Sequence, residues 1–434
     1  MKKSIRFLAL ALAALTVLLC AACGTSSDTP GTTEAATEPA PTKLTVWDAE
    51  GLHYPLIRAD EPPLNVFKAA QQLGNRLATL TGANEVYPAS DFVMIGQTLV
   101  DDNPEILIGM TNRSASKAFY DRLPDAGYGY TVTDKQIVIL GRTENLTVLA
   151  IQAFAEQVLP SSAVKTDAFT LDIGTEQILT FTGDMSTPYG MLTAGMTVSA
   201  KLGEKTSVGK LGKFGTAQGA ASDGKYFYSA LKKKVDNVET DVIAKTDMKT
   251  GKLVASSAEM PLDHCNDMCY NPEKNILVVP NMVGKRLTVI DPETLEMKDS
   301  FLADNLPGTP YAISYNAANH CYVILAGSQV CFVDCDKFTV IRSFPLISMP
   351  YVGQGVDSDD HYVYVPMSKK AEAGTNDNVL VTYDIASGKV VAQIHIAESI
   401  EIETLINVDG AYYAHFNSGG SVFYRLKFEG YFAE

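Results

Sequence analysis

Four segments in the second half of the sequence share one pattern, in which a short strand ends in Asp, a turn follows and a second strand begins. The segments are AKTDMKTGKLVAS, TVIDPETLEMKDS, CFVDCDKFTVIRS and VTYDIASGKVVAQ. Their aspartates, Asp247, Asp291, Asp334 and Asp384, are separated by 44, 43 and 50 residues. A period in the forties, with four short strands in each unit, is typical of the blades of a β-propeller. An Asp side chain can start such a turn, and Gly251 and Gly388 supply positive φ.

A second pattern appears twice, as QGAASDGKYFYSA at 218–230 and QGVDSDDHYVYVP at 354–366. Related strand-turn-strand segments are NDMCYNPEKNILVVP, YAISYNAANHCYVIL and LINVDGAYYAHF. We count five repeats, and the last lacks a clear second hairpin. The segment MTVSAKLG (196–203) can supply its missing strand and so remove a free sheet edge. We therefore expect an all-β propeller over 182–434 with five blades, and six blades stay open as an alternative.

The repeats resemble those of YVTN-type and quinoprotein-like propellers. The resemblance extends over 182–434 and implies the propeller fold. Propellers of this kind include enzymes, receptors and scaffolds, so the resemblance does not imply one function.

Residues 44–181 change periodicity several times and predict an α+β sandwich, with helices on one face of a mainly antiparallel sheet. Apolar residues spaced by three and four predict a helix that ends near Gly82, and a second helix over 145–159 has Asn145 as its expected cap. The first helix carries Val66, Ala70, Leu73, Leu77 and Leu80. Expected strands are Ile106–Ile108 in EILIGMTNR, both arms of the hairpin YGYTVTDKQIVILG, and AFTLDIG.

The phrases EILIGMTNR and GYTVTDKQIVILGRTENLTVLAIQAF resemble the small non-catalytic domain that precedes the barrel in family 20 hexosaminidases and in α-glucuronidases. In those families the catalytic carboxylates lie on a following (β/α)8 barrel. A barrel of that kind needs roughly 250 residues of alternating strand and helix, and the sequence after residue 181 has no helical periodicity. The resemblance therefore implies a structural domain and no glycosidase activity of its own.

The N-terminus reads as an export signal. Lys2, Lys3 and Arg6 precede the apolar run FLALALAALTVLLCAA, which ends at residue 22. The sequence LCAAC resembles the lipobox of bacterial lipoproteins, and this implies that Cys23 is lipidated and becomes the first residue of the mature chain. Cys20 stands where that motif usually has Leu or Val. The alternative is a plain secretory signal with a chance cysteine.

Residues 23–43 form the expected tether, because GTSSDTPGTTEAATEPAPTK has too little apolar surface to fold. Twenty residues of coil span roughly 25 Å on average and at most ~70 Å when extended. The expected localisation is the cell membrane, with the chain anchored by lipid on its extracytoplasmic face.

Charge and motifs exclude several classes of function. The net charge of −15 becomes −18 once residues 1–22 and their three cations are removed, which disfavours nucleic acid as a partner. The run LKKK at 231–234 is interpreted as solvated. We expect no cofactor, since no P-loop, dinucleotide fingerprint, Gly-x-Ser-x-Gly or His-Glu-x-x-His motif is present.

The cysteines point to neither a disulfide framework nor a metal site. Five of them, Cys265, Cys269, Cys321, Cys331 and Cys335, lie in the mature folded part, and this odd number predicts small buried side chains with at most one or two bridges. No metal is expected, because in HCNDMC and CFVDC the cysteines four apart would lie about 13 Å from each other along a strand.

Polar residues at the starts of the innermost strands define a candidate ligand site at the mouth of the propeller channel. Matching positions hold Gln218, Asn266, Tyr311, Gln354 and Thr404, and beside them lie His264, Asp267, Asp357, Glu401 and Glu403. The candidate ligand-binding residues are Gln218, His264, Asn266, Tyr311, Gln354, Asp357 and Glu401. Hydrogen bonding between blades is the structural alternative for this whole ring. Asp267, Asp357 and Glu403 are weak candidates for catalysis.

The leading hypothesis is a membrane-tethered extracellular lipoprotein whose propeller binds a glycan, a cell-wall-derived ligand or an envelope protein, with no catalysis assumed. One alternative is a carbohydrate-active hydrolase or lyase that uses the carboxylates at the mouth. Another is a structural subunit of a cell-envelope assembly.

Overall fold

The computed structural model describes residues 42–432 except 97, 210, 236–237 and 372–373. The expected signal and lipidation site, residues 1–23, and nearly all of the expected tether lie outside the described residues. Thr42–Glu434 form one compact unit. Within the described part of the chain, no helix combines the length and apolarity that crossing a membrane requires.

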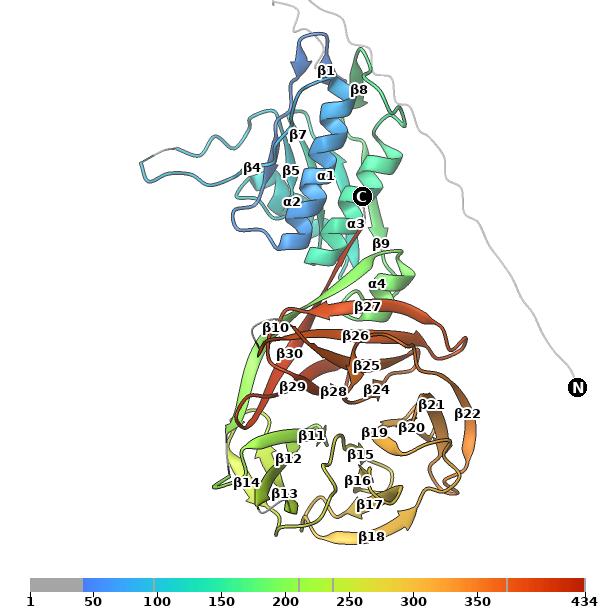
Figure 1. Ribbon diagram of the computed structural model, residues 1–434. Coiled ribbons are helices and arrows are strands. Elements are labelled where there is room, and N and C mark those ends of the chain that lie inside the picture. Colours follow the sequence, from blue (N-terminus) through green and yellow to red (C-terminus); the bar gives the residue numbers. More distant parts are fainter. Residues whose placement is uncertain (1–41, 97, 210, 236–237, 372–373, 433–434) are drawn as a thin grey trace, which may run out of the picture. The chain divides into compact units, whose positions relative to one another are not determined.

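The first part of this unit combines helices with two sheets (Figure 1). A six-stranded sheet has the order β4-β3-β5-β7-β6-β9, and a small sheet has the order β2-β1-β8. The six strands are β3 (Leu56–Arg58), β4 (Ala89–Ser90), β5 (Glu105–Ile108), β6 (Gly127–Val132), β7 (Gln136–Gly141) and β9 (Glu176–Thr180). The small sheet contains β1 (Lys43–Asp48), β2 (Gly51–Leu52) and β8 (Phe169–Asp172), and the helices are α1 (Leu64–Thr81), α2 (Ser114–Arg122) and α3 (Glu144–Gln157).

The larger sheet is mixed, and this corrects the expectation of a mainly antiparallel sheet with helices on one face. Strands β4, β3, β5 and β7 pair in parallel, whereas β6 pairs antiparallel with β7 and β9. Ile106 and Ile108 pack in one core with α1 and α3, while Leu107 packs in another with Phe119 of α2. Parallel strands bury both faces, so a continuous apolar run such as Ile106–Ile108 needs a helix on each side.

The helix ends follow local rules, with one correction. Helix α1 ends at Gly82, which adopts the left-handed conformation at φ 72° as expected for a C-terminal cap. The cap of α3 is Thr143 and not Asn145, because the Thr143 hydroxyl accepts a hydrogen bond from the backbone N–H of Leu146. Asn145 is instead buried, and its Oδ1 accepts from the backbone N–H of Gly430 at 2.9 Å.

The second part of the chain is almost entirely antiparallel sheet (Figure 1). Helix α4 (Pro188–Thr193) is an exception to the expected all-β region, and Thr187 caps it. Three four-stranded sheets follow one another along the chain, each in sequential strand order. They are β11 (Thr216–Ser222), β12 (Tyr226–Val235), β13 (Val238–Asp247) and β14 (Leu253–Ser256); β15 (Cys269–Asn271), β16 (Ile276–Asn281), β17 (Arg286–Ile290) and β18 (Met297–Leu302); and β19 (Pro310–Asn316), β20 (Cys321–Ala326), β21 (Gln329–Asp334) and β22 (Val340–Pro345).

The remaining strands form one nine-stranded sheet made of two such groups. One group contains β23 (Val352–Gly353), β24 (Asp357–Ser358), β25 (Tyr362–Lys370), β26 (Asn376–Asp384) and β27 (Val390–Ile396). The other contains β28 (Ile402–Val408), β29 (Ala411–Asn417), β30 (Ser421–Tyr431) and β10 (Thr197–Gly209). A single parallel bridge between Ala200 and Ile396 joins the two groups.

Strand β10 closes the arrangement into a ring. It precedes the first group in sequence, yet it pairs antiparallel with β30 of the last group from Thr197 to Gly209. The expectation that 196–203 completes the last repeat is therefore confirmed. The first strands of successive groups also contact one another in the order β11, β15, β19, β24 and β28, and β28 contacts β11. In one group β23 and β24, which both pair with β25, take the place of the first strand. This closed ring of antiparallel sheets is a propeller-type fold.

The repeated aspartates start the outer turns as expected. The Oδ1 atoms of Asp247, Asp291, Asp334 and Asp384 each accept a hydrogen bond from a backbone N–H two or three residues ahead, at 2.7–3.0 Å. Gly251 and Gly388 adopt positive φ, as expected. In the other two turns Leu295 and Phe338 adopt it at the equivalent position. The five cysteines of the folded part are free and buried.

The twin Ser-Asp-x-x-Tyr-x-Tyr motifs also have a structural role. In one copy Asp223 accepts from the backbone N–H of Tyr226 and from the hydroxyl of Tyr228. In the other, Asp359 accepts from the N–H of Tyr362 and from the hydroxyl of Tyr364. One carboxylate thus fixes the turn with one oxygen and a buried tyrosine with the other.

Candidate functional site at the start of the first strands

The side chains at the starts of the first strands lie in two layers of different exposure. The first layer, which contains Asp267, Asp357 and Thr404, is buried, and the second contains Glu403, which is 3% exposed, together with more exposed side chains. His264 and Glu239 keep side-chain exposures of 42% and 31%. The buried layer joins strands to one another, whereas the second layer forms a partly exposed polar group.

Asp267 is the centre of the buried layer. Its carboxylate accepts hydrogen bonds from the backbone N–H groups of Ile313 and Val356, each at 3.0 Å, and from the Thr404 hydroxyl at 2.6 Å. These partners belong to three other strand groups, so one side chain connects the inner ends of four of them. Burial raises the pKa of Asp267 to about 8, although each of these hydrogen bonds acts in the opposite direction.

Asp357 is bonded in a similar way. Its carboxylate accepts from the backbone N–H of Ser358 at 2.8 Å and from that of Asn407 on β28. Burial, the largest cause, raises its pKa well above the usual range of a carboxyl. Asp267 and Asp357 therefore have the inter-strand role that was the structural alternative for the ring.

The segment that carries Asp267 toward the ring centre has an unusual backbone. Asp263, His264 and Cys265 adopt φ of 50°, 79° and 36°, a run of left-handed non-glycine residues that costs energy at each position. Gly219 permits the approach, because a Cβ there would lie 2.4 Å from the Cα of Asp267. A Cβ on Gly355 would lie 2.6 Å from the Thr404 hydroxyl. The repeated Gln-Gly pairs thus mark close contacts between neighbouring first strands.

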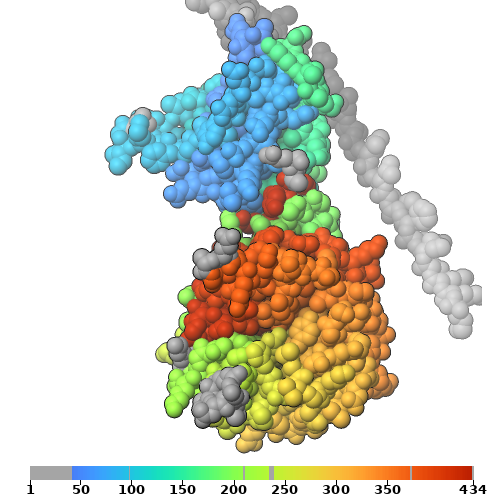
Figure 2. All heavy atoms as spheres, viewed as in Figure 1, coloured from blue at the N-terminus to red at the C-terminus, as the bar shows by residue number. Residues whose placement is uncertain are grey.

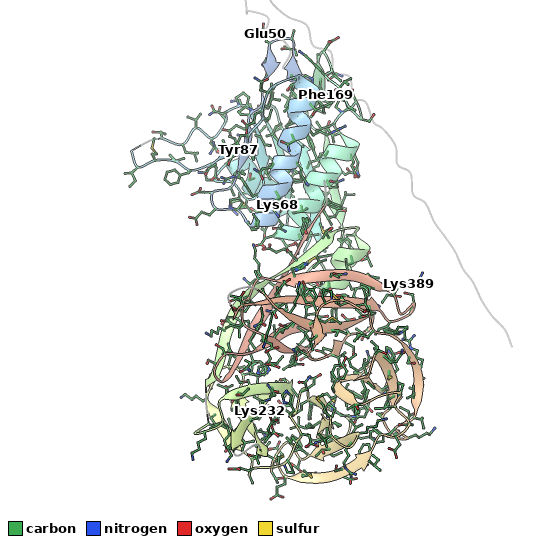
Figure 3. All side chains as sticks on the ribbon, in the orientation of Figure 1. Glu50, Lys68, Tyr87, Phe169, Lys232 and Lys389 are labelled. Atoms are coloured by element: carbon green, nitrogen blue, oxygen red, sulfur yellow. The ribbon has the colours of Figure 1, made fainter. Side chains whose placement is uncertain are left out.

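The second layer is a polar cluster, which we call the mouth cluster. It consists of Gln218, Lys232, Glu239, His264, Gln354, Glu401 and Glu403. The Lys232 ammonium lies 3.1 Å from Oε1 of Gln218 and 2.7 Å from Nδ1 of His264, and that nitrogen lies 3.4 Å from the Glu239 carboxylate. Lys232 lies on β12 and is labelled in Figure 3.

The other side of the mouth cluster is built from amides and carboxylates. The Gln354 amide donates to Oε1 of Glu401 at 2.9 Å, and its backbone carbonyl accepts from Asn266 at 3.0 Å. Glu401 lies just before β28 and Glu403 is the second residue of that strand, where a bulge between Ile402 and Thr404 interrupts the pairing with β29.

Charges within the cluster influence one another. Burial and, as the second cause, the neighbouring Glu401 raise the pKa of Glu403 to about 8. Burial lowers the pKa of His264, and the positive charge of Lys232 adds to this effect. At neutral pH the cluster therefore contains a neutral imidazole at His264 and a largely protonated carboxyl at Glu403.

The sequence prediction of this site was partly incomplete. Tyr311, one of the predicted ligand-binding residues, packs against the apolar core that strands β19–β22 share with β25–β27. Burial raises its pKa to about 12. Lys232 and Glu239 were missed, and the interpretation of LKKK as solvated is wrong for Lys232, which hydrogen-bonds inside the cluster. The alternation of side chains along β12 was the available signal, since every second residue of a strand faces inward.

Two other features of the described residues bear on binding, the lack of a metal-ligand group and a cavity. His, Cys, Asp and Glu side chains there form no group of three that could hold a metal ion. A cavity of about 930 Å³ lies away from the mouth cluster, lined by the ends of β5 and β7, the start of α3 and part of β29 and β30.

Comparisons with known proteins add little. No family model matches the chain, and no curated protein matches it. Among solved structures, glutaminyl cyclase from Myxococcus xanthus shares 10% identity at a TM-score of 0.39, covering 54% of this chain and 98% of that one. A Staphylococcus aureus phage tail fibre shares 13% identity at 0.40, covering 52% of each chain. A β-propeller domain from Myceliophteria thermophila shares 13% at 0.29, covering 46% of this chain and 62% of that one. Since each TM-score is below 0.5, the propeller-type fold rests on the strand topology.

Proposed function

We propose that the chain is a lipoprotein anchored through Cys23 on the extracytoplasmic face of a membrane, with a five-bladed propeller that binds a glycan at the mouth cluster. The anchor rests on the sequence of residues 1–23, and the blade count rests on the ring of first strands closed by β10. The α+β region, residues 44–181 in the sequence prediction, serves as a spacer or second contact surface.

The observation that carries the binding proposal is the mixture of groups in the mouth cluster. Lys232 and Gln354 supply donors, Glu239 and Glu401 supply acceptors, and the imidazole of His264 is 42% exposed. Sugar hydroxyls both donate and accept, so a site for a neutral glycan needs both kinds of group held at fixed positions. The hydrogen bonds within the cluster and the strained backbone at His264 provide that fixed geometry.

A binding screen against glycans and cell-wall fragments tests the proposal on Thr42–Glu434. The site variant is Lys232→Met, which keeps the length of the side chain and removes its charge and donors. The matched control is Lys389→Met, on an exposed turn labelled in Figure 3. We expect at least about a tenfold loss of affinity in the site variant and none in the control. Equal affinity of the two variants would place the ligand elsewhere, and no binding by the intact unit would favour an envelope protein as partner.

One observation favours hydrolysis of the bound glycan as a second function. Glu401 lies near Glu403, and burial together with this neighbour raises the pKa of Glu403 to about 8, so one carboxyl of the pair stays largely protonated near pH 7. Such a pair can act as general acid and as base or nucleophile in glycoside hydrolysis. Release of sugar from the ligand that the screen identifies, abolished in Glu403→Gln with binding retained, would support it; a ligand that stays intact would exclude it.

A further inference from the structure

A segment with an apolar, uncharged tip projects from the α+β region between β4 and β5. We call residues 91–96 and 98–104 the arm, and Figures 1 and 2 show them standing away from the rest of that region. From Phe92 to Val100 the sequence FVMIGQTLV contains no charged residue. Its apolar side chains are exposed: Phe92 63%, Met94 58%, Ile95 106%, Leu99 38% and Val100 50%. Soluble proteins rarely gather so many exposed apolar side chains without a binding role.

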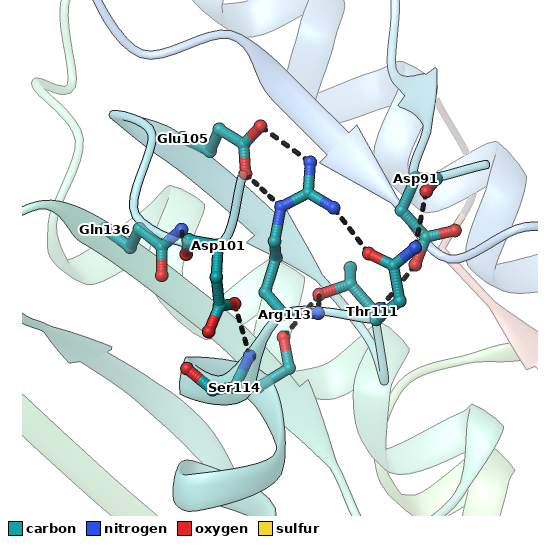
Figure 4. Close-up of polar contacts among 9 residues, drawn as sticks. Asp91, Asp101, Glu105, Thr111, Arg113, Ser114 and Gln136 are labelled. Atoms are coloured by element: carbon teal, nitrogen blue, oxygen red, sulfur yellow. Dashed lines mark hydrogen bonds and ion pairs between the residues drawn. The ribbon is translucent and has the colours of Figure 1, made fainter. Parts of the chain in front are cut away.

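Hydrogen bonds fix the base of the arm at both ends (Figure 4). On one side Asp91 accepts from the backbone N–H groups of Asp60 at 2.7 Å and of Asn112 at 2.6 Å. On the other side Asp101 accepts from the N–H of Ser114 at 2.7 Å, and its carbonyl accepts from the Gln136 amide at 2.9 Å. The arm is thus held out from a defined base.

A buried ion pair supports this base. Arg113 donates two hydrogen bonds to Glu105, at 2.8 and 2.9 Å, and both side chains are less than a tenth exposed (Figure 4). Arg113 also donates to Asn112, which in turn bonds Asp91. Glu105 and Arg113 are the first and last residues of EILIGMTNR, so this motif serves to hold the arm.

The chemistry of the arm favours a lipid surface as its partner. A bilayer accepts apolar side chains on a loop without any complementary pocket. The sequence predicts a tether between the proposed lipid on Cys23 and Thr42, and a coil of that length would span roughly 25 Å and so would keep the folded unit close to the bilayer. Asp91, Asp101 and Asp102 flank the apolar tip and limit how deep it can enter, since a carboxylate is costly inside a bilayer.

We propose that Phe92–Gly96 and Thr98–Val100 insert into the interface of the bilayer to which the chain is anchored, as a second contact that orients the folded unit. This proposal depends on the proposed function in one respect only, which is that the lipid anchor brings the bilayer near the arm. Because the flanking residues are acidic and the mature chain carries a net charge of −18, the arm prefers zwitterionic to anionic lipid.

Vesicle cosedimentation tests the proposal with Thr42–Glu434, which forms one compact unit and lacks the lipidated cysteine. Phosphatidylcholine vesicles are the probe, and the arm variant is Phe92→Asp with Ile95→Asp. The matched control is Val283→Asp, a valine 70% exposed on the turn between β16 and β17. We expect the intact unit and the control to bind, the arm variant to bind at least about tenfold more weakly, and added phosphatidylglycerol to weaken binding.

Three results would overturn the proposal: no binding by the intact unit, equal binding by the arm variant, or a concentration-dependent dimer that the arm variant loses while no protein reaches the vesicles. The last result would identify a second copy as the partner. We expect Lys232→Met to bind vesicles like the intact unit. The vesicle assay therefore tests the arm independently of glycan binding at the mouth cluster.

Discussion

Single residues decide how closely the first strands meet. Asp267 reaches three other strand groups only because Gly219 leaves space beside its backbone and because Asp263–Cys265 accept a left-handed conformation. The sequence indicated Gln218 and its glycine through the repeated Gln-Gly pair. It placed Asp267 in the ring, with hydrogen bonding between blades as the structural alternative, but it did not indicate that this one side chain would reach three other groups, since that depends on tertiary contacts.

Replacing Gly219 by Ala tests this contact. The new Cβ would lie 2.4 Å from the Cα of Asp267, and that Cα belongs to backbone that cannot easily move. We expect a loss of about 2–4 kcal/mol in the free energy of unfolding, measured with urea. Gly174→Ala serves as control, because its Cβ meets open space and only the positive φ costs about 1–2 kcal/mol. A smaller loss for Gly219→Ala than for Gly174→Ala would contradict the close contact.

The buried carboxyl of Glu403 predicts a pH dependence of stability. Its pKa rises from 4.5 to about 8 on folding, so the folded state holds a proton that the unfolded state releases. Its contribution to stability is complete below about pH 4.5 and is lost as pH rises toward 8. In thermal melts from pH 5 to 8, Glu403→Gln should lose less stability than the intact unit over that range. Identical pH profiles would show that Glu403 is ionised in the folded state.

At the level of elements, periodic patterns predicted most of what local rules control. Helix α1, the hairpin β6–β7 and the Asp-led turns occur where expected. Helix α2 was missed because SASKAFYDR buries only Ser116 and Phe119 and so shows no apolar stripe. The parallel order of β3, β5 and β7 was missed because pairing direction depends on crossovers that periodicity does not record.

Strand β10 is the element on which ring closure depends. Val198 is 4% exposed and belongs to the main core, and β10 is the only link among described strands between β30 and β27. We expect Val198→Asp to cost about 3 kcal/mol or more in urea unfolding, since it buries an unpaired charge at the closing strand. Val391→Asp on β27, at a valine 43% exposed, should cost under about 1 kcal/mol. Similar losses at both sites would contradict the role of β10 as the closing strand.

For the whole molecule, the sequence repeat was sufficient to predict a propeller and its closing strand. It was not sufficient to predict which residues form the mouth cluster. The repeat marks positions within each strand group, and the cluster also needs Lys232 and Glu239, which no repeat marks. The proposed function has the same division, in which the ring provides rigid strand starts and the non-repeating side chains would contact the ligand.

The central claim is that the mouth cluster binds the ligand, and hydrogen exchange of Thr42–Glu434 with and without the glycan identified by the screen tests it most directly. We predict slower exchange of backbone amides at 262–268, 354–358 and 401–405, where the cluster is attached to the first strands. Slower exchange confined to the α+β region, or along the 930 Å³ cavity beside β29 and β30, would contradict the claim and place the site there.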